Sequence, residues 1–185
     1  MKRLLLPILL IVAATLALPA QSKAPAKATA KAATAAPPPF TIVEAGIADM
    51  RAAMEQRRVT SRDLVQQCLV RIALHEERLN AVMTVNPRAL DEAEALDRER
   101  AQGKVRGPLH GIPIALKDNI HTTDMPTTGG ALAFAGLMPP YDATLTKNLR
   151  DAGAVIIAKT VLTELANWVA SGMPGNYSAL GGYGM

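Results

Sequence analysis

Two short apolar runs constrain the fold of this chain more than any other feature. IPIAL (112–116) follows a loop rich in glycine and proline, and AVIIA (154–158) follows a helix-like segment that ends at Gly153. Short apolar runs bounded by turn formers are typical of buried strands. A third run, AVMTV (81–85), also has the length of a strand. Because helical patterns alternate with these runs, the sequence predicts an α/β domain with a mixed, partly parallel sheet flanked by helices.

Apolar residues at helical spacing predict the helices between the strands. The expected helices cover residues 41–57, 59–81, 88–103, 142–153 and 161–171. Thr60 and Asp63 form a helix-start signature for the second of these helices. Asp142 is expected to cap the fourth helix, with Leu145 and Leu149 facing inward. The remaining segments, 121–136 and 172–185, are rich in turn formers and are predicted to be loops.

The first 20 residues have the layout of a secretory signal peptide. Lys2 and Arg3 are followed by an apolar run from Leu4 to about Leu18, and small residues surround Ala20. The apolar run is shorter than the roughly 20 residues that a membrane-spanning helix needs. We therefore expect cleavage and export to the periplasm or the medium, with no stable membrane anchor afterwards. A retained N-terminal anchor is the alternative.

Residues 21–39 are almost entirely Ala, Lys, Thr and Pro, so they cannot bury enough apolar surface to fold and are predicted to form a disordered linker. The domain is thus expected to span residues 40–185. The chain has 20 Lys and Arg and 16 Asp and Glu, but five of the basic residues and none of the acids precede Phe40. The domain therefore has a net charge of −1, and its charge balance predicts no nucleic-acid partner.

The cysteine and histidines indicate neither a metal nor a cofactor. Cys68 is the single cysteine and falls in the apolar face of a predicted helix, which is typical of a small core residue. His75, His110 and His121 do not form a pair with metal-ligand spacing. The prediction is a site without metal or cofactor.

Lys117 directly follows the strand predicted at 112–116. The simple interpretation is a strand-end lysine that reaches water. The functional interpretation rests on its position, because functional side chains of parallel sheets gather at the carboxyl ends of strands. In a partly dry site, desolvation disfavours the ammonium form, and the neutral amine can then take a proton from a serine hydroxyl. Lys117 is therefore a candidate general base.

The ordered motifs around Lys117 resemble the N-terminal part of the amidase signature family of hydrolases, and peptide amidases in particular. The series is GPLHGIPIALKDNI (107–120), TTGGALAF (127–134) and DATLTKNLRDAGAVIIAKTVLTELA (142–166). The resemblance runs from about residue 42 to the end of the chain. Its Gly-x-Pro-x-x-x-Lys-Asp motif is carried by Gly111, Pro113, Lys117 and Asp118.

The resemblance implies a Ser–cis-Ser–Lys mechanism for hydrolysis of carboxamide C–N bonds. In that family, the lysine at the position of Lys117 serves a bridging serine, which activates a nucleophilic serine. The resemblance places both serines in a Gly-Gly-Ser-Ser-Gly-type motif beyond Met185, so Ser171 and Ser178 are interpreted as loop serines. The 185 residues by themselves are therefore expected to be inactive.

The resemblance also suggests roles for other residues. Gly172 and Met173 are expected to bind substrate, as part of a wall formed by the loop 172–176. Asp118 and Asn119 have two open interpretations, as caps of the turn after the strand or as members of the site. The glycines of the segment 127–130 are expected to form tight turns near the site.

Three functions remain open. The first is an exported amidase whose substrate is a small-molecule or peptide amide. The second is a catalytically dead, truncated product with at most a binding role. The third is an A-type subunit of a tRNA-dependent amidotransferase, which the predicted signal peptide argues against because that reaction is cytoplasmic.

Overall fold

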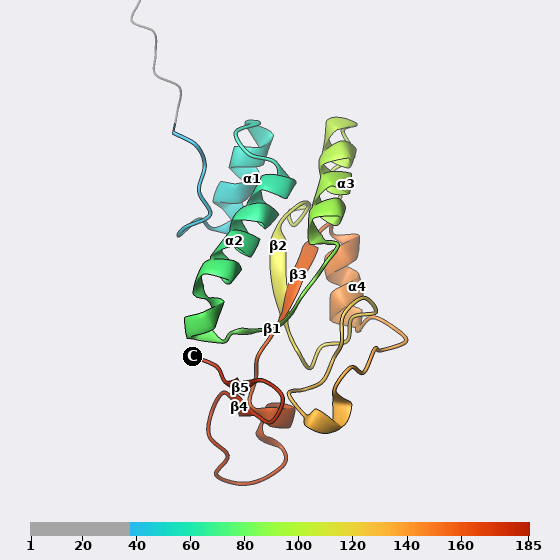
Figure 1. Ribbon diagram of the computed structural model, residues 1–185. Helices are drawn as coiled ribbons and strands as arrows, with labels where there is room; N and C mark the ends of the chain where they lie inside the picture. Colours follow the sequence, from blue (N-terminus) through green and yellow to red (C-terminus); the bar gives the residue numbers. More distant parts are fainter. Residues whose placement is uncertain (1–37) are drawn as a thin grey trace, which may run out of the picture. The chain divides into compact units, whose positions relative to one another are not determined.

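The computed structural model describes residues 38–185 and contains an α/β arrangement of helices around a mixed sheet (Figure 1). The predicted signal peptide (1–20) and residues 21–37 of the predicted linker lie outside the described residues. Within the described part of the chain, no helix is both long and apolar enough to cross a membrane. In chain order the elements are α1 (Ile47–Glu55), α2 (Ser61–Leu79), β1 (Val82–Val85), α3 (Ala89–Ala101), β2 (Pro113–Lys117), η1 (Leu132–Phe134), α4 (Thr144–Asp151), β3 (Val155–Thr160), η2 (Glu164–Asn167), β4 (Tyr177–Ser178) and β5 (Gly182–Tyr183).

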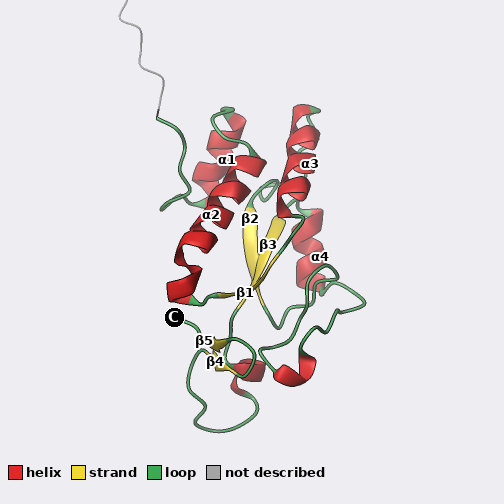
Figure 2. Ribbon diagram, in the orientation of Figure 1, coloured by secondary structure: helices red, strands yellow, loops and turns green. Residues whose placement is uncertain are grey.

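The main sheet has three strands in the order β1-β3-β2 (Figure 2). β2 runs parallel to β3, with Pro113 opposite Val155 and Lys117 opposite Thr160. β1 runs antiparallel to β3. The predicted mixed sheet is therefore confirmed. The central strand is buried along most of its length, whereas Ala115 and Lys117 of β2 are exposed, because β2 is an edge strand among the described residues.

Helices cover both faces of this sheet. Val155 and Ile157 of β3 pack against α2 and α3, whereas Ile156 points to the opposite face and belongs to the cluster that Leu149 of α4 contacts. This alternation follows from the two-residue period of a strand. α1 contributes Met54 to a further cluster that includes Leu64 and Ile112.

The start of α2 is capped from two directions. The Thr60 hydroxyl accepts a hydrogen bond from Asp63 N at 3.0 Å, and the Asp63 carboxylate accepts one from Thr60 N at 3.0 Å. This reciprocal capping confirms the predicted helix-start signature. Asp97 of α3 also accepts hydrogen bonds from the first two backbone N–H groups of the helix, Ser61 N at 2.8 Å and Arg62 N at 3.0 Å. The Asp97 contacts tie α2 to α3.

Two other predicted helix starts are wrong. α1 begins at Ile47 instead of Thr41, because Gly46 occupies the N-cap position and donates its backbone N–H to Asp49 at 2.9 Å. Asp142 does not cap α4, whose N-cap residue is Ala143. The Asp142 carboxylate instead accepts a hydrogen bond from Thr123 N at 2.8 Å and pairs with Arg150 at 3.1 Å.

The inward face of α4 also differs from the prediction. Leu149 packs on the core as expected, but the Leu145 side chain is 50 % exposed. Thr146 is the buried residue of this helix, and its hydroxyl donates to His121 O at 2.7 Å. A polar side chain is tolerated there because this hydrogen bond satisfies it.

The helix predicted at 161–171 is reduced to the single 3-10 turn η2. Leu165 and Ala166 have φ values of 46° and 55°, which end any helix. Leu165 N donates to Gly129 O at 2.7 Å, so the chain here follows a loop distant in sequence. The segment 172–185, predicted as an open loop, contains the two-stranded ribbon β4-β5.

Candidate functional site

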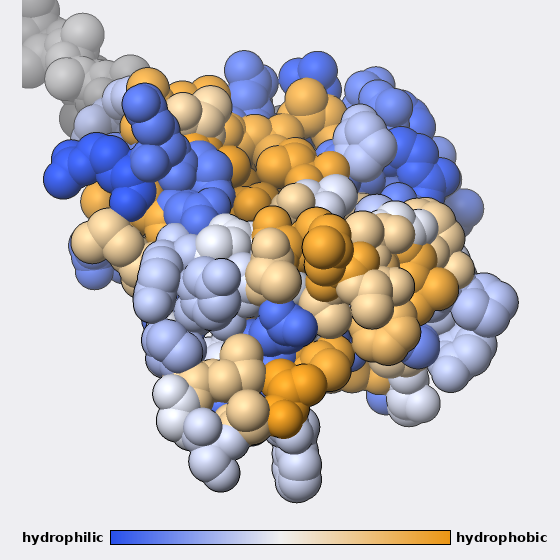
Figure 3. Space-filling model, turned by 60° about the horizontal axis from the view of Figure 1, so that its bottom comes forward, coloured by the Kyte–Doolittle hydropathy of each residue, from blue (hydrophilic) through white to orange (hydrophobic). Residues whose placement is uncertain are grey.

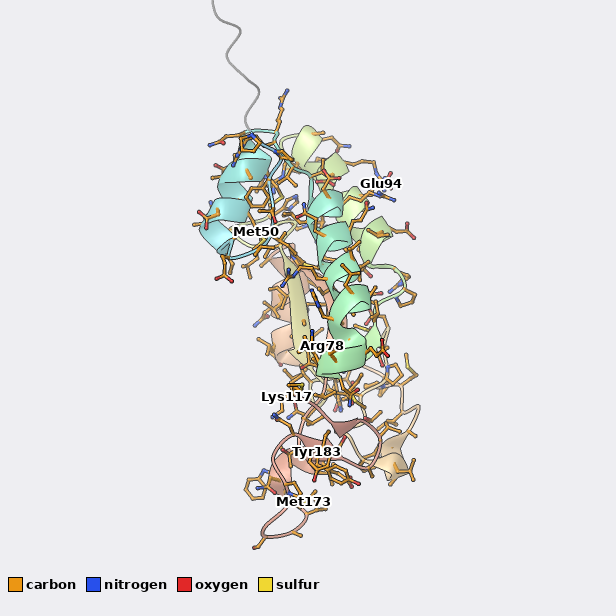
Figure 4. All side chains as sticks on the ribbon, turned by 60° about the vertical axis from the view of Figure 1, so that its left-hand side comes forward. Met50, Arg78, Glu94, Lys117, Met173 and Tyr183 are labelled. Carbon is orange, nitrogen blue, oxygen red and sulfur yellow. The ribbon has the colours of Figure 1, made fainter. Side chains whose placement is uncertain are left out.

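Lys117 is the last residue of β2 and lies at the carboxyl edge of the parallel pair, where its side chain is exposed. Figure 4 shows it at the lower end of the strand. Among residues 38–185, no carboxylate lies within ion-pair distance of its ammonium group. Its amine is therefore accessible to a reacting group from outside this part of the chain.

A second lysine lies at the same edge in opposite surroundings. Lys159 of β3 is paired with Leu116 and is fully buried. Its Nζ donates to Thr127 Oγ1 at 2.7 Å and to Pro126 O at 3.1 Å, and it lies 3.4 Å from Asp118 Oδ1. Burial lowers the pKa of Lys159, and the attraction of the Asp118 carboxylate offsets part of that effect.

Sequence reasoning did not single out Lys159. The sequence could have indicated its burial, because Lys159 directly follows the apolar run 154–158 and would be buried if the strand continued through it. A buried lysine needs a partner. The partner could not be read from the sequence, because Asp118 lies about 40 residues earlier, in the turn after β2.

Asp118 is 1 % exposed and acts as an anchor for the turn that follows. Its Oδ2 accepts a hydrogen bond from Thr128 N at 3.0 Å and another from the Thr128 hydroxyl. Its backbone O accepts from Gly129 N at 3.1 Å, and its own N–H donates to Thr160 O at 3.0 Å. Of the two interpretations left open for Asp118, this geometry favours the structural one. Asn119 is exposed.

The segment 127–130 forms the tight turn expected from its glycines. Gly130 has a φ of +74°, and a Cβ at this position would lie 2.6 Å from Ser178 Cβ. The carbonyl oxygens of Gly129 and Gly130 accept hydrogen bonds from Leu165 N at 2.7 Å and Leu180 N at 3.0 Å. The turn therefore joins the end of β2 to the last 20 or so residues of the chain.

Neither late serine has the surroundings of a nucleophile among the described residues. Ser178 is 1 % exposed, and its hydroxyl accepts a hydrogen bond from Gly181 N at 3.0 Å within the β4-β5 turn. Ser171 is exposed in the preceding loop. Ser171 lies in a loop as expected, whereas Ser178 is the last residue of β4.

Gly172 and Met173 lie in the loop between η2 and β4. Gly172 has a φ of +80° and no neighbour within 4 Å of an added Cβ, and Met173 is half-buried. Figure 4 shows Met173 well separated from Lys117. The described residues do not bring this loop onto Lys117, and its role in substrate binding stays a prediction.

A cavity of about 390 Å³ opens beside the buried pair. It lies between the start of β1, the loop 126–136 and the β4-β5 turn, with Asp118 and Thr128 in its wall and Lys117 outside it. Its lining also includes the polar residues Asn80 and Thr84 and the apolar residues Met83 and Leu180.

The contact between Lys159 and Thr127 has the arrangement of a base and a hydroxyl. Both side chains are buried, however, and the Lys159 ammonium also faces Pro126 O and the Asp118 carboxylate. Such surroundings hold a cation in place. Lys159 therefore acts as an anchor, whereas Lys117 is exposed at the end of β2 and has no ion-pair partner among the described residues.

Comparison with known proteins supplies the family. Residues 63–176 match the sequence profile described as Amidase. The chain belongs to the amidase family. The match includes both edge lysines, the turn 127–130 and the ion pair of Asp118.

Individual amidase-family proteins agree over a longer stretch. A crystal structure of native peptide amidase from Stenotrophomonas maltophilia superposes with a TM-score of 0.75 and 46 % identity, covering 79 % of this chain and 30 % of that protein. A Schizosaccharomyces pombe protein that is named as an amidase is 41 % identical over 144 residues, which is 77 % of this chain and 25 % of that protein. The A-type chain of the chloroplastic/mitochondrial glutamyl-tRNA(Gln) amidotransferase of Vitis vinifera is 38 % identical over 127 residues, or 69 % of this chain and 23 % of that protein. The chain thus spans about a quarter of the length of the curated relatives it matches.

Proposed function

We propose that this amidase-family chain supplies the general base, Lys117, of an enzyme that hydrolyses carboxamide C–N bonds. The observation that carries the proposal is the contrast between the two lysines at the carboxyl ends of β2 and β3. Lys159 is enclosed by Thr127, Pro126 and Asp118, whereas Lys117 is exposed and has no ion-pair partner among the described residues. A base must reach the group that it deprotonates.

The proposed chemistry follows the Ser–cis-Ser–Lys scheme. The neutral amine of Lys117 takes a proton from a bridging serine, which takes one from a nucleophilic serine. The nucleophile attacks the amide carbonyl, and the C–N bond breaks as the proton returns to the leaving nitrogen. Water then hydrolyses the acyl-enzyme to a carboxylic acid. Both serines are proposed to lie in polypeptide beyond Met185, and covering polypeptide or substrate would exclude water and favour the neutral amine.

The proposed substrate class is a small-molecule or peptide amide. The similarity to the Stenotrophomonas maltophilia peptide amidase supports a peptide amide. Export to the periplasm or the medium, proposed from residues 1–20, suits a substrate that comes from outside the cell.

The function is tested on the protein isolated from its own source, after its intact mass has been measured. A mass well above that of this chain, with release of ammonia from a C-terminal peptide amide, is expected for the complete enzyme. Lys117→Ala should reduce turnover by at least about 1,000-fold, since it removes the base. Lys104→Ala, at another exposed lysine, is the matched control and should leave turnover unchanged. Full activity of the Lys117 variant would refute the assignment.

Residues 40–185 alone are proposed to hydrolyse no amide, because Ser178 is buried at the end of β4 and Ser171 lies in an exposed loop. If the isolated protein has the mass of residues 21–185, the alternative of a catalytically dead product with at most a binding role gains support. Turnover by that short protein that is lost in Lys117→Ala would instead show that its own serines suffice.

A second candidate function is that of an A-type chain in a tRNA-dependent amidotransferase. The specific observation in its favour is the 38 % identity to the Vitis vinifera protein. Such a chain should release ammonia from glutamine, and peptide amides should be poor substrates. Comparing ammonia release from glutamine and from a peptide amide therefore separates the two candidates.

A further inference from the structure

We propose that Lys159 is a positioning residue that, together with Asp118, clamps the 127–130 turn onto the end of β2 and so fixes the surroundings of Lys117. This inference rests on the proposed function of Lys117 where it concerns turnover. Its structural half stands on the contacts of Lys159 alone.

The clamp has two arms. The ammonium of Lys159 holds the approach to the turn through Pro126 O and Thr127 Oγ1. The carboxylate of Asp118 holds the next residue through the N–H and hydroxyl of Thr128. Because Lys159 and Asp118 also face each other at 3.4 Å, the two arms form one buried unit.

The unit is joined directly to Lys117. Asp118 follows Lys117 in sequence, and its N–H donates to Thr160 O across the two strands at 3.0 Å. Thr160 follows Lys159 in the same way and lies opposite Lys117 in the register. The two buried members of the clamp, Asp118 and Lys159, are therefore each next in sequence to a residue of the Lys117–Thr160 pair.

The clamp also reaches η2 and the segment that follows it. The turn accepts hydrogen bonds from Leu165 N and Leu180 N, and Gly130 approaches Ser178 too closely for a Cβ. A loosened turn would release this segment together with the end of β2. Misplacement of a catalytic group by about 1 Å can reduce turnover about 100-fold.

The test uses the protein isolated from its source and four variants. Lys159→Met keeps the length of the side chain but removes its donors. Asp118→Asn/Lys159→Met removes both charges, so it separates loss of the clamp from the cost of an unpaired buried carboxylate. Lys117→Ala and Lys104→Ala are the controls. The readouts are hydrogen exchange of the amides in 127–130, 165 and 180, exchange within α2, and kcat and KM for a peptide amide.

The expected result is exchange at least about 10-fold faster in 127–130, 165 and 180 in both Lys159 variants, with exchange in α2 unchanged. We expect kcat to fall about 100-fold with a smaller change in KM, because geometry at the reacting group is affected. Lys117→Ala should lose turnover and keep wild-type exchange. This pair of patterns distinguishes a clamp from a base.

Several results would overturn the proposal. Wild-type exchange in the turn of the double variant would show that Lys159 only neutralises Asp118. Failure of both Lys159 variants to fold would assign the pair to global stability, and an unprotected turn in the unaltered protein would mean that no clamp exists. If Lys117→Ala remained active, the proposed function would fail, and exchange would still decide on the clamp.

Discussion

At the scale of single residues, the two lysines at the sheet edge show how little residue type determines a role. Lys117 and Lys159 end or nearly end neighbouring parallel strands, yet the first is exposed and the second is fully buried. The register shift between β2 and β3 places Lys159 opposite Leu116, on the side of the sheet that packs against Met125. Burial forces Lys159 to find acceptors, and it finds them in the turn that organises the edge.

Lys159 should leave a signature in the pH dependence of stability. Because its pKa in the folded protein is lowered from 10.5, the unfolded state holds the lysine proton more tightly between the two values. Raising the pH through that window should therefore increase the free energy of unfolding, by up to about 1.4 kcal/mol per pH unit. Below the folded pKa the cost of the buried charge is fully present.

Urea denaturation of the isolated protein between pH 7 and 10.5 checks this, with Asp118→Asn/Lys159→Met as reference. The partly buried Cys68 thiol acts in the opposite direction above its ordinary pKa of 9.0, since burial raises its pKa. Both proteins retain Cys68, so the difference between their curves isolates Lys159. Parallel curves would contradict the prediction. Lys159→Met alone should lose about 3–5 kcal/mol at neutral pH, because it leaves the Asp118 carboxylate buried without its cation.

At the scale of elements, the turn 127–130 can be tested through one glycine. Gly130→Ala should destabilise the protein by about 2–4 kcal/mol, because it combines a left-handed backbone with a Cβ placed 2.6 Å from Ser178 Cβ. Gly172→Ala is the matched control: its φ of +80° is similar, but its Cβ would meet nothing within 4 Å. It should lose only about 1–2 kcal/mol. Equal losses in denaturation midpoints would show that the contact with Ser178 does not matter.

The junction of α2 and α3 offers a second test. Asp97→Ala should cost about 1–2 kcal/mol, because it removes the acceptor for two N–H groups at the start of α2. Glu94→Ala, one turn earlier on α3, removes only exposed ion pairs with Arg62 and Arg98 and should cost about 0.5 kcal/mol or less. Thermal unfolding of both variants provides the comparison, and a larger loss in the Glu94 variant would refute the capping role of Asp97.

The same elements show which features the sequence could predict. Local chemistry predicted correctly the capping of α2 by Thr60 and the position of Lys117 at a strand end. It failed where a distant residue decides. Asp142 pairs with Arg150 and Thr123 instead of capping α4, and Leu165 bonds to Gly129 instead of continuing a helix. The clamp could not be predicted for the same reason, since Lys159 and its acceptors lie more than 30 residues apart.

At the scale of the whole molecule, the described residues leave much apolar surface uncovered. Apolar side chains make up a large part of the face turned forward in Figure 3. Large side chains with 44 % or more of their surface exposed include Leu132, Phe134, Leu137, Met138, Trp168 and Met185. Exposed apolar surface is unfavourable in water, and large contiguous patches of it are typical of interfaces. β1 and β2 also pair only with β3 among the described residues.

We therefore expect residues 40–185, expressed alone, to be poorly soluble or to form a molten state, because exposed apolar side chains and unpaired strand edges promote association. Size-exclusion chromatography, binding of a hydrophobic dye and near-ultraviolet circular dichroism would detect this. A monodisperse protein with a single cooperative unfolding transition would contradict the expectation.

The central position of β3 also has a consequence for how the chain acquires its fold during synthesis. β1 and β2 leave the ribosome first, and neither has its partner until Val155–Thr160 emerges. The buried lysine and the acceptors that surround it come together only then, because Lys159 is part of the last of the three strands. The nascent chain must therefore keep two strand edges from pairing wrongly while more than 35 further residues are translated after β2. The three-stranded sheet can therefore form only after β3 has been synthesised.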